Sequence, residues 1–230
     1  MLVLSLLCCL TGAAHAAPAS HPAAPHKAYL SLIIDDLGQN LPRDRRVLGL
    51  PGPVTTAVMP DTPHAAEFAR EAYKAGKLRA IGVSNFFPDR LADICTYAEI
   101  KPMVNQVETH PFDQQRKAHE YMDKFGVAHE SWGPFAEGRK DMFKNSVIQA
   151  VGDRYGKTVA QVILRFLMQS DVIVIPKSTH KERMIQNLDV FDFKLNEEDM
   201  KQIQGLDEAD SAFFSHYDPE MIEMLSKFNV

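Results

Sequence analysis

The chain has 230 residues, a formal net charge of −5 at pH 7, 45% apolar residues and 24% charged residues. This composition is typical of a folded globular protein and excludes a chain that is disordered throughout. The acidic balance gives no indication of nucleic-acid binding. No apolar run reaches the roughly 18 residues that a membrane-spanning helix requires.

The N-terminus has features of an export signal. Leu2–Leu10 is a short apolar run, and Ala14-His15-Ala16 offers the small residues that a signal peptidase recognises. We therefore predict a signal peptide over residues 1–16 and a flexible Ala- and Pro-rich linker over residues 17–27. No Lys or Arg precedes the apolar run, so a disordered apolar tail is the alternative.

The rest of the chain alternates strand-like and helix-like segments. Six short apolar, β-prone runs predict strands at 28–34, 54–59, 78–83, 102–107, 127–132 and 172–175. Apolar residues at helical spacing predict helices at 62–76, 88–99, 114–125, 147–155, 158–169, 180–188 and 196–206, and a short one near the C-terminus. Such alternation requires parallel strands joined by right-handed crossovers. We predict an α/β fold, an incomplete TIM-type (β/α) barrel of about six parallel strands.

Functional residues of such folds lie at the carboxyl ends of the strands. Lys177 and Ser178 follow the last predicted strand, and Arg183 falls in the first turns of the next helix. Cations at a helix N-terminus form an anion site, although a solvated basic patch is the alternative. Trp132, the only tryptophan, ends another predicted strand, where it can bind a planar ring or simply fill a core.

Longer motifs carry a family resemblance. The carriers are Glu71–Phe86 (EAYKAGKLRAIGVSNF), Val104–Pro111 (VNQVETHP), Glu130–Gly138 (ESWGPFAEG), Thr158–Phe166 (TVAQVILRF), Val174–Asn187 (VIPKSTHKERMIQN), Phe191–Asp199 (FDFKLNEED) and Phe213–Met221 (FFSHYDPEM). From about Ala72 to Val230 the chain resembles the C-terminal half of an aldo-keto reductase, in the branch related to diketogluconate reductases. Residues 78–230 would then form an NADP-binding half-barrel.

The resemblance implies an NADP(H) site along the strand ends. Ser84, Asn85 and Gln106 would bind the nicotinamide carboxamide, and Trp132 would stack on the ring. The remaining residues would contact the pyrophosphate, the 2′-phosphate and the adenine. The pyrophosphate would be contacted by Gly133, Pro134 and Phe135, and the 2′-phosphate by Lys177, Ser178, Thr179 and Arg183. The adenine would be contacted by Gln186 and Asn187. Ser84 and Asn85 can equally cap the helix predicted after them.

The family's catalytic residues are missing from this resemblance. Aldo-keto reductases use Tyr, Lys, Asp and His from the first half of the barrel, and none of the six tyrosines here lies in the family's acid motif. A carbonyl oxygen that gains negative charge needs a proton donor, so we assign no catalytic residue and expect weak or absent carbonyl reduction. About six strands leave an open barrel with exposed edges, so we expect dimerisation or another homo-oligomer, strand swapping, or marginal stability.

Residues 28–77 resemble the start of a divergent polysaccharide deacetylase. The carriers are Ile33–Gly38 (IIDDLG), Leu50–Met59 (LPGPVTTAVM) and Pro60–Ala65 (PDTPHA). By this resemblance Asp36, after Asp35, and His64 would be metal ligands, but a zinc site needs at least one more. The alternative is that the aspartates cap a helix and that His64 lies in a first helical turn.

The sequence therefore reads as a chimera with three functional hypotheses. The first is an NADP-dependent oxidoreductase of aldo-keto reductase type that acts on small carbonyl compounds. The second is a non-catalytic chimeric or scaffold protein, and the third is a metal-dependent exported carbohydrate deacetylase. The signal-like N-terminus favours export, whereas the reductase resemblance favours the cytoplasm, where NADPH is available.

Overall fold

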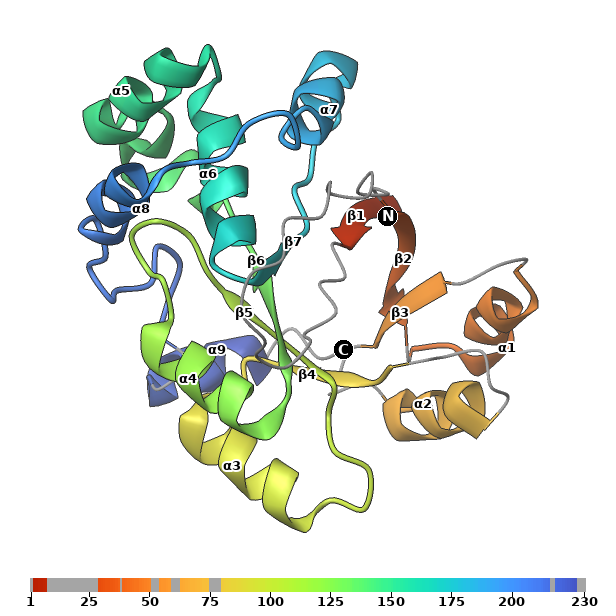
Figure 1. The fold of residues 1–230 in the computed structure, drawn as a ribbon. Helices are drawn as coiled ribbons and strands as arrows, with labels where there is room; N and C mark the ends of the chain where they lie inside the picture. Colours follow the sequence, from red (N-terminus) through yellow and green to blue (C-terminus); the bar gives the residue numbers. More distant parts are fainter. Residues whose placement is uncertain are drawn as a thin grey trace, which may run out of the picture.

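One sheet organises the fold of this computed structural model (Figure 1). The structure describes residues 2–7, 29–37, 39–50, 54–58, 63–74, 80–215 and 218–226. In these residues, seven strands follow the order β3-β2-β1-β7-β6-β5-β4. Their bounds are Leu2–Leu7 (β1), Tyr29–Leu37 (β2), Val54–Val58 (β3), Gly82–Ser84 (β4), Val104–Glu108 (β5), Ala128–Trp132 (β6) and Val172–Val174 (β7).

All six predicted strands are present and run in one direction. β4, β5, β6 and β7 are successive parallel neighbours, and β2 and β3 form a second parallel pair. β1 is antiparallel to both β2 and β7, so it joins the two groups without reversing one against the other. This confirms the parallel α/β fold. β3 and β4 end the strand order among the described residues, so the sheet is not closed there.

The seventh strand lies within the predicted signal peptide. Leu2 pairs with Ile34 and Leu7 with Tyr29, so β1 matches β2 along its whole length, and Leu6 pairs with Val174 of β7. A short apolar run suits a buried strand as well as it suits an export signal, which is why its pattern did not indicate a strand. The signal peptide stays a prediction, and the predicted linker lies outside the described residues.

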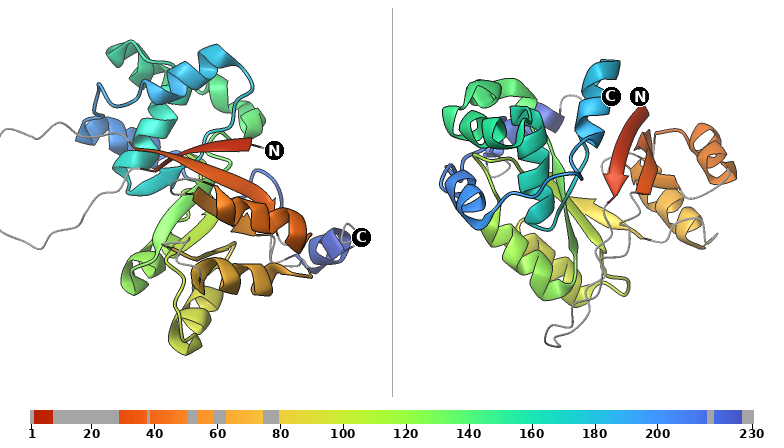
Figure 2. Two further views of the ribbon diagram at one scale, coloured as in Figure 1. Left: turned by 90° about the vertical axis from the view of Figure 1, so that its right-hand side faces the viewer. Right: turned by 45° about the horizontal axis from the view of Figure 1, so that its top comes forward.

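Helices lie on the outside of the sheet (Figures 1 and 2). Their bounds are Leu41–Asp44 (α1), Ala65–Lys74 (α2), Pro88–Tyr97 (α3), Arg116–Phe125 (α4), Ser146–Tyr155 (α5), Val159–Gln169 (α6), Lys181–Leu188 (α7), Glu197–Gln204 (α8) and Pro219–Ser226 (α9), with 3₁₀ turns at Arg45–Gly49 (η1) and Ala136–Lys144 (η2). Local chemistry sets several ends: Thr158 and Gln161 form a capping box that starts α6, and Gly156 ends α5 at φ +63°.

Packed apolar clusters attach these helices to the strands. Ile148, Leu164 and Ile203 from α5, α6 and α8 share one cluster with Val174 of β7. Leu91 and Met122 from α3 and α4 pack with Val107 of β5 in a second buried cluster. Burying such side chains contributes roughly 1.5–3 kcal/mol each, so the outer helices hold the strands in register.

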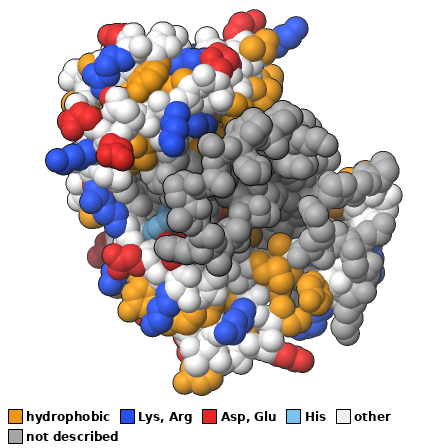
Figure 3. Space-filling model, in the orientation of Figure 1, with side chains coloured by type: hydrophobic (Ala, Val, Ile, Leu, Met, Phe, Trp, Pro, Cys, Tyr) orange, Lys and Arg blue, Asp and Glu red, His pale blue; other side chains and the backbone are white. Residues whose placement is uncertain are grey.

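A third cluster lies at the β2–β3 end of the sheet (Figure 1). Leu37, Leu41 and Phe68 are its buried members, and they pack α1 and α2 against the end of β2. On the face in Figure 3, basic and acidic side chains are intermixed over the surface of the helices. None of the helices in the described ranges combines the length and apolarity needed to cross a membrane.

Candidate functional site

Four of the predicted cofactor residues meet where β4, β5 and β6 lie side by side. Ser84 ends β4, and its Oγ donates to the backbone carbonyl of Gln106 in β5 over 3.0 Å. The backbone N–H of Asn85 donates to the same carbonyl over 2.9 Å. Trp132, at the end of β6, donates its indole Nε1–H to Asn85 Oδ1 over 2.8 Å. The parallel register thus brings these residues together, as the sequence predicts.

The loop after β4 has an unusual backbone that fixes its side chains. Asn85 is left-handed, with φ +55°, a conformation that asparagine tolerates better than most residues. Phe86, the residue after Asn85, is held by Asn105, which is fully buried in β5. Asn105 Nδ2 donates to Phe86 O over 2.7 Å, and Asn105 Oδ1 accepts from Phe86 N over 3.3 Å. Asn105 is not among the residues predicted from the sequence, although it directly precedes Gln106 in the VNQ motif.

A buried carboxyl lies beside Gln106. Glu130 of β6 is opposite Gln106 in the sheet, and its Oε1 accepts a hydrogen bond from Gln106 Nε2 over 2.5 Å. Burial raises the pKa of Glu130, and the hydrogen bond from Gln106 only partly opposes this. Glu130 stands two residues before Trp132 in the ESW motif, and this period-2 spacing is the signal that could have found it.

Phe213 of the C-terminal segment packs against Trp132 with its ring tilted by 56°. The rings of Trp132 and Phe213 lie 5.1 Å apart between centroids, and the Arg139 guanidinium lies 4.5 Å from the Phe213 centroid. Gly133 adopts φ +65°, and a Cβ there would approach Phe213 to 3.3 Å. Glycine at this position therefore allows both the turn after β6 and the close approach of the C-terminal segment.

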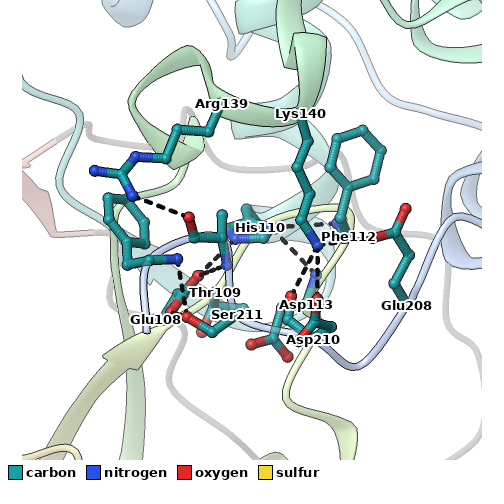
Figure 4. A network of polar contacts seen from close by, with 12 residues as sticks. Glu108, Thr109, His110, Phe112, Asp113, Arg139, Lys140, Glu208, Asp210 and Ser211 are labelled. Atoms are coloured by element: carbon teal, nitrogen blue, oxygen red, sulfur yellow. Dashed lines mark hydrogen bonds and ion pairs between the residues drawn. The ribbon is translucent and has the colours of Figure 1, made fainter. Parts of the chain in front are cut away.

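Buried polar contacts attach that segment to the end of β5 (Figure 4). Glu108 Oε2 accepts from Ser211 Oγ over 2.6 Å, and Glu108 Oε1 accepts from the backbone N–H of Ala212 over 2.8 Å. His110 Nδ1 accepts from the backbone of Asp113, so its Nε2 carries the proton and donates to Glu108 Oε1 over 2.9 Å. Burial alone would raise the pKa of Glu108, but these hydrogen bonds outweigh it and lower the pKa.

A basic loop connects the same segment to the turn after β6. Lys140 of η2 contacts Glu208 over 2.7 Å and Asp210 over 3.3 Å, as Figure 4 shows. Gly133, Pro134 and Phe135 lead into η2, and the Phe135 ring packs on Phe143 at 5.7 Å.

The predicted phosphate-binding residues follow β7, the neighbour of β6. Lys177, Ser178 and Thr179 form the loop, and Arg183 lies in the first turn of α7. Ser178 Oγ accepts from the backbone N–H of His180 over 3.1 Å, just before the helix begins. Lys177, Arg183 and Gln186 are exposed, whereas Asn187 is buried at the inner side of α7.

Comparison with known proteins decides the family. Residues 53–208 match the aldo/keto reductase family. The chain belongs to the aldo/keto reductase family. The match begins before the motifs on which the resemblance rests, so it includes part of residues 28–77, for which the sequence predicts a deacetylase-like fragment. That finer assignment stays a prediction.

Relatives within the aldo/keto reductase family include several carbonyl reductases. Glyoxal reductase of Bacillus subtilis (strain 168) is 46% identical over 134 residues, which are 58% of this chain and 48% of that protein. Aldose reductase B of Dictyostelium discoideum is 40% identical over 131 residues, 57% of this chain and 42% of that protein. The chain thus spans about half the length of the curated relatives it matches.

Solved aldo-keto reductases share the fold. MGS-M4, an aldo-keto reductase from a Medee basin deep-sea metagenome library, superposes with a TM-score of 0.63 at 38% identity, over 67% of this chain and 57% of that one. A Gox0644 variant in complex with NADPH gives 0.60 at 36% identity, over 67% and 56%.

The tyrosine side chains that the structure describes lie on helices rather than at the strand ends. The four tyrosine side chains in the described ranges lie on helices α2 to α5: Tyr73, Tyr97, Tyr121 and Tyr155. The Tyr155 hydroxyl donates to Asp199, and the Tyr121 ring packs on Phe125. None of these four lies on a strand end.

Of the two predicted metal ligands, the structure describes the side chain of His64 but not that of Asp36, so the predicted pair stays a prediction. His64 precedes α2 and makes a 3.8 Å contact with Glu67, one turn along the chain. Asp36 belongs to β2, but its side chain lies outside the described residues. Among the side chains that are described, no group of three or more His, Cys, Asp and Glu residues has the arrangement of a metal site.

Proposed function

We propose that this chain binds NADP(H) at the ends of β4 to β7 and is an oxidoreductase of aldo-keto reductase type for small carbonyl compounds. We further propose that its turnover is weak or absent. The chain spans about half the length of its curated relatives, so the proposal concerns first the cofactor.

The observation that carries the proposal is the polarity of two side-chain amides. Asn85 Oδ1 is occupied by Trp132, which leaves Asn85 Nδ2 to donate. Gln106 Nε2 is occupied by Glu130, which leaves Gln106 Oε1 to accept. A nicotinamide carboxamide has one C=O and one NH₂, so it needs one donor and one acceptor. Asn85, just after β4, and Gln106, in the adjacent strand β5, offer that complementary pair.

Other predicted residues fit the rest of the dinucleotide. The partly buried Trp132 lies beside Asn85 and offers an aromatic surface for the nicotinamide ring. Lys177 and Arg183 carry exposed cations at the start of α7, where backbone N–H groups add to the attraction for an anion. The 2′-phosphate of NADP(H) is such an anion, and glyoxal and aldose reductases among the relatives support carbonyl substrates.

The proposal of weak turnover rests on the proton donor. Hydride transfer to a carbonyl carbon leaves charge on the oxygen, which a positioned acid must neutralise. Loss of such a donor costs roughly 10²–10⁴ in rate. The described tyrosine hydroxyls are on helices rather than at the strand ends, and this supports cofactor binding without efficient reduction.

A fluorescence titration tests the proposal, because Trp132 is the only tryptophan. NADPH is added to the full chain while Trp132 emission is followed, and we expect saturable quenching together with a higher melting temperature. No quenching and no thermal shift at millimolar NADPH would leave the non-catalytic scaffold as the better description. Aldehyde reduction at the rate of a complete aldo-keto reductase would contradict the missing acid.

A further inference from the structure

Glu130 is a buried carboxyl with little to stabilise its charge. It is 8% exposed, and among the described residues its hydrogen-bond partner is the neutral amide of Gln106. Burial raises its pKa, and no cation among the described residues opposes this effect. A buried carboxylate without a charged partner costs stability, and replacement by a neutral residue is often neutral or favourable. Packing therefore gives no reason for a carboxylate at this position.

The orientation of Gln106 gives such a reason. A glutamine side chain can rotate by 180° and exchange its oxygen and its nitrogen. In its ionised form Glu130 only accepts hydrogen bonds. Its Oε1 accepts from Gln106 Nε2, and this contact turns Gln106 Oε1 away from Glu130. We propose that Glu130 is a positioning residue that locks the Gln106 amide with its oxygen toward the nicotinamide carboxamide. This inference rests on the proposed NADP(H) site.

The sheet keeps the two side chains in reach of each other. Gln106 and Glu130 are direct register partners in the parallel pair β5–β6. One residue along, Val107 is fully buried on the opposite face under α3 and α4, so a slip in register would remove both contacts at once. The same face of β6 carries Trp132 two residues later, so the Gln106–Glu130 hydrogen bond lies next to the proposed ring-stacking residue.

The affinity for a coenzyme analogue tests the orientation of the Gln106 amide directly. Reduced 3-acetylpyridine adenine dinucleotide phosphate has a methyl group where NADPH has NH₂, so it cannot donate to Gln106 Oε1. We expect the native chain to bind NADPH about five- to tenfold more tightly than this analogue, the value of one hydrogen bond. Both dissociation constants come from the Trp132 titration.

Two variants separate positioning from packing. Glu130→Gln keeps the shape but can donate as well as accept, so Gln106 loses its fixed orientation and the preference should fall to less than about twofold. In the double variant Gln106→Glu with Glu130→Gln, the carboxylate at 106 can only accept. This variant should restore the preference for NADPH, although the two residue types have exchanged places.

The outcomes are distinct. If Glu130 only supports packing, Glu130→Gln weakens both coenzymes equally and the ratio stays, which overturns the lock. A double variant without restored preference overturns it as well. A native chain that binds neither coenzyme overturns the proposed function and this inference with it, whereas a native chain that binds both equally overturns the lock alone. Unchanged thermal unfolding of Glu130→Gln provides the folding control.

Discussion

Trp132 and Asn85 are joined by a 2.8 Å hydrogen bond across 47 residues of sequence. The bond fixes the indole at the end of β6 against the loop after β4, and it sets which end of the Asn85 amide is free. Because Asn85 also has a left-handed backbone, one residue supplies both the turn and the side-chain contact. Substitutions can separate these two contributions.

Asn85→Gly should weaken NADPH binding without destabilising the turn. Glycine adopts φ +55° without strain, so only the side-chain contacts with Trp132 and the carboxamide are lost. We expect about a five- to tenfold loss in NADPH affinity, the value of roughly one hydrogen bond. Asn85→Ala is the matched comparison, because it adds about 1–2 kcal/mol of backbone strain and should also lower the melting temperature. Equal melting temperatures for the two variants would contradict the assigned role of the backbone.

Lys177→Ala and Arg183→Ala should weaken NADPH binding far more than NADH binding. Both cations are exposed around the start of α7, and only NADPH carries the 2′-phosphate that they would bind. A charge-assisted hydrogen bond is worth about 1.5–3 kcal/mol, so each variant should lose about tenfold or more in NADPH affinity. Lys201→Ala, on α8, is the control of equal charge change. Equal losses for NADPH and NADH would refute the phosphate assignment.

The sequence predicted the strands well because their signals are local. Val172–Val174 is apolar throughout and buried at both valines, and it was assigned from that pattern alone. Helix ends with strong caps, such as Thr158 and Asn196, were also predicted correctly. β1 was missed because an apolar run of six residues fits an export signal and a strand equally well.

The candidate site could be predicted only in part. The backbone order of strands is enough to gather Ser84, Asn85, Gln106 and Trp132, because parallel strands end at one edge. The partners of those residues depend on register and on distant loops. Glu130 meets Gln106 only in one strand alignment, and Ser211 reaches Glu108 across 103 residues. Period-2 spacing places Glu130 on the same face of the strand as Trp132, but periodicity alone does not specify either contact.

Ser211→Ala should loosen the cover over Trp132. Ser211 Oγ donates to Glu108, and it accepts from the backbone N–H groups of Phe213 and Phe214 over 3.0 Å each. Its loss leaves a buried carboxylate short of one donor, which costs about 1–3 kcal/mol, and frees Phe213 to leave Trp132. We expect a red-shifted Trp132 emission and a lower melting temperature. Ser146→Ala, at an exposed position of α5, should change neither, and unchanged emission in Ser211→Ala would show that Phe213 is held by other contacts.

Asp113→Asn should stabilise the protein at neutral pH but not at acidic pH. Burial, followed by the charge of Glu108, raises the pKa of Asp113 to about 6. Between the unfolded value near 3.9 and this value, the folded chain binds more protons than the unfolded chain, so the contribution of Asp113 to stability falls as pH rises. The full penalty is present above pH 6, and asparagine removes it while its oxygen still accepts from Gln115.

We expect Asp113→Asn to exceed the native chain by about 1–2 kcal/mol at pH 7.5, since solvent screening reduces the roughly 3 kcal/mol that a two-unit shift implies. Near pH 4 the two proteins should be equally stable, because Asp113 is then protonated when folded. Urea unfolding at both pH values measures the difference, with Asp93→Asn on the exposed face of α3 as control. A gain that is the same at both pH values would mean that the substitution acts through packing rather than through the buried charge.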